Sequence, residues 1–170
     1  MTTHPEACLI GSNREADERV SAATEVVFSA LARCALPAEL NLCGHCYSPE
    51  QLERFACTPL RELSNEDARV LLWETGDHWP DANTLKHFLP RALKELARTN
   101  GVGDLYPGHL FEVLAHHHFG AWPHNERAVI SAWFDALEER FDAGETLDPE
   151  WTAARQKAGI YAGPEAGEVL

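Results

Sequence analysis

The sequence predicts an all-α protein, a compact single-domain bundle of six or seven helices. Three observations support this fold class. Apolar residues recur with helical spacing, no run shows convincing apolar–polar alternation, and Ser, Asp, Pro and Gly residues mark helix starts and ends. Of the 170 residues, 45% are hydrophobic and 24% are charged, which suffices for a core without a disulfide or metal. We expect residues 1–160 to form one domain and residues 161–170 to form a flexible tail.

The first predicted helix begins at Ser12 or Asn13, either of which can cap its N-terminus. It runs to about Cys34, because Pro37 cannot continue a helix. The positions that we expect to face the core follow helical spacing and are Val20, Ala23, Val27, Leu31 and Cys34.

The second and third helices have strong start signals. The segment Ser48-Pro49-Glu50-Gln51 combines an N-cap, a proline at the first helical position and a glutamine that can complete a capping box. Thr58-Pro59 ends this short helix. Ser64 caps the next helix, which ends before Gly76.

Asp81 caps a predicted helix that runs to about Thr99 and has one apolar stripe. Pro90 lies inside it and predicts a kink or a split into two helices. Four basic residues form a second stripe on the opposite side. We interpret this stripe either as a solvated helix face or as a site for an anion or an acidic partner; its members are His87, Arg91, Lys94 and Arg98.

The C-terminal part predicts three further helices. Pro107 opens one that runs to about Phe119 and ends at Gly120. Pro123 opens the next, to about Asp142, and the last covers residues 149–157.

The 27 acidic and 14 basic side chains give a formal net charge of -13. This charge disfavours binding to nucleic acids and to anionic membrane surfaces, since both repel an acidic protein. The N-terminus has no basic segment of the kind that begins a secretory signal, and no apolar run is long enough to span a bilayer. We therefore expect a cytoplasmic protein.

The acidic excess is concentrated near the C-terminus. Between residues 134 and 150 there are seven acids and one base, Arg140. One interpretation is a solvated surface that aids solubility, and the other is a docking surface for a basic protein partner. The seven candidate partner-binding residues are Asp135, Glu138, Glu139, Asp142, Glu145, Asp148 and Glu150.

The cysteines and histidines suggest a metal site as a second possibility. Cys43 and Cys46 form a close pair, which with two further thiolates, Cys34 and Cys57, would supply four ligands for zinc. The same pair would suit a redox protein, although that chemistry normally requires a strand before the motif. The third interpretation is that the cysteines are reduced, partly buried side chains.

One helix face carries another candidate site for a divalent metal. His109, Glu112 and His116 share this face. The sequence has no glycine-rich phosphate loop and no nucleophile elbow.

Several segments resemble an uncharacterised family of small bacterial helical proteins. They are a short Cys-containing segment before Pro49, the TPLRELS segment at residues 58–64, the KHFLPR segment at residues 86–91, and the tryptophan-containing segments at 122–123 and 133–137. The resemblance implies a soluble helical bacterial protein without an established activity.

Taken together, these patterns favour a non-catalytic acidic interaction protein, an adaptor or an inhibitor of the immunity type, that binds a basic protein partner. The alternative is a helical protein that binds metal, either a zinc-stabilised protein or a metal-dependent enzyme that uses the cysteines and histidines.

Overall fold

The computed structural model describes the backbone of residues 6–34, 36, 40, 42, 45–73, 80–99, 107–142 and 149–160. Side chains are described for the same residues except 6–13, 72, 73, 107, 108, 142, 149, 150 and 152. Within this part of the chain every regular element is helical, which confirms the predicted all-α bundle. The helices are α1 (Glu6–Leu31), α2 (Pro49–Cys57), η1 (Leu60–Glu62), α3 (Asn65–Trp73), α4 (Ala82–Thr99), α5 (Pro107–His116), η2 (Phe119–Ala121), α6 (His124–Asp142) and α7 (Pro149–Lys157).

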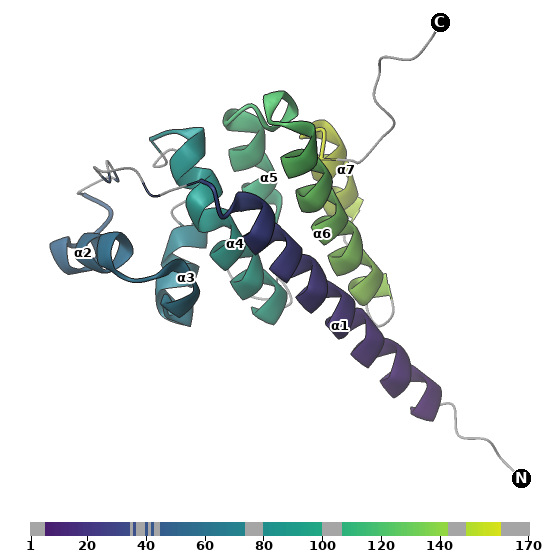
Figure 1. Ribbon diagram of the computed structural model, residues 1–170. Helices are drawn as coiled ribbons and strands as arrows, with labels where there is room; N and C mark the ends of the chain where they lie inside the picture. Colours follow the sequence, from purple (N-terminus) through teal and green to yellow (C-terminus); the bar gives the residue numbers. More distant parts are fainter. Residues whose placement is uncertain are drawn as a thin grey trace, which may run out of the picture.

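Three long helices, α1, α4 and α6, form the centre of the bundle (Figure 1). Helix α1 runs antiparallel to α6, because Arg33 contacts Glu126 at one end of the pair and Arg19 contacts Glu139 at the other. In the middle, the indole Nε1 of Trp133 donates a hydrogen bond to the Thr24 hydroxyl at 2.8 Å. Trp133 is completely buried and anchors this interface.

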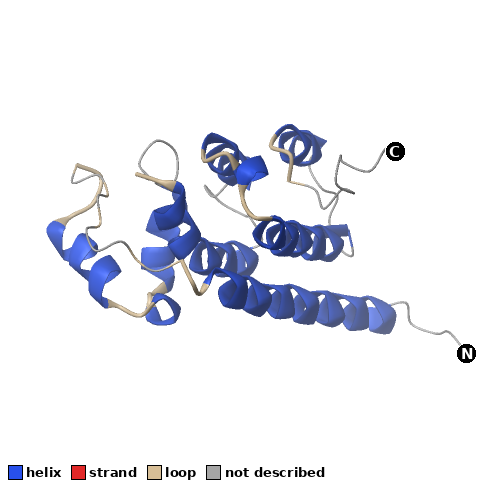
Figure 2. Cartoon of the chain, turned by 45° about the horizontal axis from the view of Figure 1, so that its top comes forward, coloured by secondary structure: helices blue, strands red, loops and turns tan. Residues whose placement is uncertain are grey.

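The remaining helices lie on two sides of this centre (Figure 2). On one side α3 packs on α4, and Phe55 of α2 contacts Phe88 of α4. On the other side α5 and α7 pack together and against α6, through contacts of Trp151 with Phe111 and Phe134. Helix α4 is therefore covered on more than one face, and 11 of its 18 residues are buried.

The structure confirms the predicted helix starts that depend on local hydrogen bonds. Ser48 and Gln51 form the capping box of α2, Ser64 Oγ accepts from the Asp67 amide, and Asp81 Oδ1 accepts from the Thr84 amide at 2.9 Å. Thr58 is the C-cap of α2.

Several predicted boundaries were wrong. Helix α1 begins at Glu6 and ends at Leu31, and α4 continues through Pro90, which excludes a split into two helices. Helix α5 ends at His116, three residues earlier than predicted. The chain turns there because His118 adopts a left-handed conformation with φ of 54°, which no helix continues. Among the described residues, no helix has the length and apolarity needed to cross a bilayer.

Candidate functional site

The acidic residues of α6 do not form one uniform solvated face. Asp135 and Glu138 both pair with Arg155 of α7, with N–O distances of 2.6 Å each. The Arg155 side chain is completely buried, and it also donates to the carbonyls of Ile160 and Ser131. These two acids therefore hold α7 against α6, because a buried guanidinium requires anionic partners.

The other predicted partner-binding residues are placed differently. Glu139 is 59% exposed and pairs with Arg19, which is 52% exposed. The side chains of Asp142 and Glu150, and the whole of Glu145 and Asp148, lie outside the described residues.

The sequence is strongly acidic after these contacts. Residues 141–150 contain four acids and no base.

The basic stripe of α4 is not a continuous solvated face either. Arg91 is buried, with 4% of its side chain exposed, and donates to the Leu63 carbonyl and to Asn65 Oδ1. His87 Nδ1 lies 2.8 Å from the Cys34 carbonyl. The stripe is interrupted because η1 and the start of α3 cover Arg91, and the end of α1 covers His87. The other two members of the stripe, Lys94 and Arg98, are exposed.

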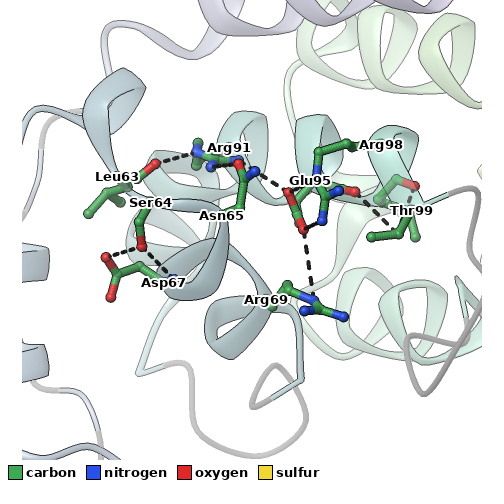
Figure 3. A network of polar contacts seen from close by, with 10 residues as sticks. Leu63, Ser64, Asn65, Asp67, Arg69, Arg91, Glu95, Arg98 and Thr99 are labelled. Carbon is green, nitrogen blue, oxygen red and sulfur yellow. Dashed lines mark hydrogen bonds and ion pairs between the residues drawn. The ribbon is translucent and has the colours of Figure 1, made fainter.

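A buried carboxylate, Glu95, organises this region (Figure 3). Its side chain is completely buried, and Arg98 donates to both of its oxygens at 2.9 and 2.6 Å. Arg69 and Arg91 lie 3.9 and 4.0 Å from it. Three guanidinium groups thus surround one carboxylate, which offsets the cost of burying its charge.

A pocket of about 320 Å³ opens beside Glu95, between α1, the second half of α4 and the ends of α3 and α6. Its volume is in the range of small-ligand sites. Its lining combines three cations, three anions, three uncharged polar residues and two small apolar ones: Lys94, Arg98, Arg140, Asp17, Glu25, Glu95, Ser21, Thr24, Asn65, Val20 and Ala97.

A second buried carboxylate, Glu126, joins the three central helices at their other end. Lys86 of α4 lies 2.8 Å from Oε2, and Arg33 at the end of α1 lies 2.5 Å from Oε1. The Lys86 ammonium also lies 4.4 Å from the centre of the Trp122 ring, a cation–π contact. Burial by itself raises the pKa of Glu126, but hydrogen bonds from Arg33 and Lys86 outweigh burial and hold this pKa below its ordinary value of 4.5.

This carboxylate makes the stability of the protein sensitive to acid. Because the folded-state pKa of Glu126 is depressed, its contribution is complete above the unfolded-state pKa and is lost as the pH falls through the folded-state value. We therefore expect the free energy of unfolding to fall more steeply between pH 6 and pH 3 in the wild type than in Glu126→Gln. Urea denaturation at several pH values measures both slopes, and equal slopes would contradict this role of Glu126.

The cysteines do not form a metal site among the described residues. Cys34 is partly buried at the end of α1, Cys46 is partly buried and Cys57 is exposed, while Cys43 lies outside the described residues. Burial, followed by the charge of Glu126, raises the pKa of the Cys34 thiol above its ordinary value, which reduces its reactivity.

The histidine face of α5 does not form a metal site either, among the described residues. His109 Nδ1 lies 3.9 Å from Glu112. In the described part of the chain, no three His, Cys, Asp or Glu side chains gather as metal ligands.

Sequence reasoning missed the three charged residues around which these contacts are built, Glu95, Glu126 and Arg155. Each lies on a helix that was predicted, but none belongs to a recognisable motif. For Glu95 the available signal was its helical spacing from Arg91 and Arg98, two members of the basic stripe. Comparison with protein-family models, curated proteins and solved structures finds no match to this chain.

Proposed function

We propose that the protein is a non-catalytic interaction protein, an adaptor or an inhibitor, that binds a basic protein partner through acids of residues 139–150. The observation that carries the proposal is the concentration of acids in one segment. Residues 139–150 contain five acids and one base, Arg140, and residues 141–150 contain four acids and no base. An uncompensated acidic segment attracts a basic surface and steers its approach.

The contacts on α6 narrow the set of acids that we assign to the partner. Asp135 and Glu138 are engaged by the buried Arg155 and serve the fold. Glu139 is available, because an exposed ion pair such as Glu139–Arg19 contributes only about 0–1 kcal/mol and exchanges partners readily. The proposed binding residues are Glu139, Asp142, Glu145, Asp148 and Glu150.

The test is a charge reversal that leaves the Arg155 contacts intact. The triple variant Glu139→Lys, Asp142→Lys and Glu145→Lys is compared with the wild type by affinity capture from an extract of the natural source, with quantitative mass spectrometry. We expect the wild type to retain one or more proteins of high isoelectric point, and the triple variant to lose them. Capture should also fail at 0.5 M NaCl, which screens charges beyond about 4 Å.

A matched control carries the same charge change at the other end of the molecule. Glu53→Lys, Glu62→Lys and Glu66→Lys replace three exposed acids on α2, η1 and α3, far from α7 (Figure 1). This control should retain the partner. The proposal fails if the wild type captures no basic protein, or if the control loses the partner as completely as the test variant.

A further inference from the structure

We propose that the pocket beside Glu95 binds a small molecule through an oxyanion, a carboxylate or a phosphate. The lining of this pocket includes none of the proposed partner-binding acids. The inference depends on which hydrogen-bonding groups of the lining are already occupied. A ligand must supply what the pocket lacks, because a hydrogen-bond donor binds only an acceptor, and an acceptor only a donor.

Most acceptors of the lining are occupied, whereas Asp17 at the rim is 65% exposed and lies 3.4 Å from Arg140. Both carboxylate oxygens of Glu25 pair with Arg61, at 3.0 and 2.9 Å. Both oxygens of Glu95 accept from Arg98, and Asn65 Oδ1 accepts from Arg91 at 2.8 Å. The Thr24 hydroxyl donates to the Val20 carbonyl and accepts from Trp133.

Several donors of the lining, in contrast, remain available. Among the described residues, the Lys94 ammonium has no hydrogen-bond or ion-pair partner, and neither do the Ser21 hydroxyl or the Asn65 side-chain amide nitrogen. Arg98 uses Nε and Nη2 on Glu95, which leaves Nη1 for a further acceptor. A pocket with free donors and occupied acceptors selects a ligand rich in acceptors, and oxyanions are the strongest of these.

The charges of the lining are balanced, with three cations and three carboxylates. Arg61, Arg69 and Arg91 lie outside the lining and compensate Glu25 and Glu95. The two carboxylates therefore oppose an incoming anion less than unpaired carboxylates would.

The test titrates the full-length protein with two probes, inorganic phosphate and glutarate, and follows binding by calorimetry. We expect at least one probe to bind with a Kd of about 1 mM or below. Tighter binding of phosphate would identify a phosphorylated ligand, and tighter binding of glutarate a carboxylate ligand.

Three variants separate a built site from general attraction between charges. Lys94→Gln should weaken binding of the preferred probe about tenfold or more, because it removes a charged donor; Lys94 is exposed, so the fold is retained. Lys157→Gln removes an exposed lysine on α7 and should leave the Kd unchanged. Asp17→Asn removes an anion from the rim and should strengthen binding.

Three results would overturn the proposal. They are the absence of binding by both probes at 10 mM, an unchanged Kd in Lys94→Gln, and an equal loss in Lys94→Gln and Lys157→Gln. Circular dichroism of each variant verifies that it is folded.

Discussion

Replacing Arg155 with methionine will lower the free energy of unfolding by about 3 kcal/mol. The guanidinium is completely buried and makes two ion pairs and two hydrogen bonds to carbonyls, so methionine fills part of the volume but leaves all four acceptors without their donor. Asp135 and Glu138 retain partial access to water, which keeps the loss below that of a fully buried pair. Urea denaturation at pH 7 measures the change.

The same variant should loosen α7 before the rest of the bundle unfolds. Arg155 joins α7 to Ser131, Asp135 and Glu138 of α6, and Trp151 adds a hydrogen bond from Nε1 to Glu138. Hydrogen exchange should therefore accelerate across α7 more than across α1. Arg14→Met is the control, because Arg14 is 83% exposed, and it should change stability by less than about 0.5 kcal/mol. Equal losses in the two variants would show that burial of Arg155 is not what stabilises this interface.

The parts of the fold that the sequence could predict are those that depend on near neighbours. The Ser48 capping box, the Ser64 cap and the Asp81 cap each involve atoms at most three residues apart, so the residue types alone specify them. The end of α5 that was wrong depends on a backbone conformation that no residue type signals. His118 adopts a left-handed conformation there, and the Trp122 indole donates a hydrogen bond to the His117 carbonyl beside it.

The contacts of the charged residues could not be predicted from a single sequence. Arg33 and Glu126 are 93 residues apart, and Asp135 and Arg155 are 20 apart. A helical wheel of α4 places Arg91 opposite the apolar stripe, where a charged residue is normally solvated. Its burial follows only from the packing of η1 and α3 over that side of the helix.

The contacts of individual side chains in the acidic segment and in the pocket could not be predicted from the sequence either. Counting charges located the acidic segment, because net charge is a property of composition. It could not separate Glu138, which the buried Arg155 engages, from Glu139, which is exposed. It also could not identify the pocket, whose donors and acceptors come from four different helices.

Replacing Glu95 with glutamine will destabilise the protein by about 3 kcal/mol, although the side chain keeps its shape. The carboxylate is completely buried and lies beside three arginines, of which Arg91 is itself buried. Removing the negative charge leaves the Arg91 cation without its counter-charge in a medium of low polarity. Arg69 and Arg98 are half-exposed, so water can solvate them and limit the loss.

A double-mutant cycle separates this charge effect from simple loss of packing. In Arg91→Met with Glu95→Met, both buried charges are replaced by flexible apolar side chains, and such replacements cost less than breaking one partner of a pair. The single variants of the cycle are Arg91→Met and Glu95→Met. We expect the double variant to lose at least about 1 kcal/mol less free energy of unfolding than the sum of the losses in these two single variants. Additive losses in urea denaturation would mean that Arg91 and Glu95 stabilise the fold independently. In that case Arg98, which donates to both Glu95 oxygens, would carry the main interaction with the buried carboxylate.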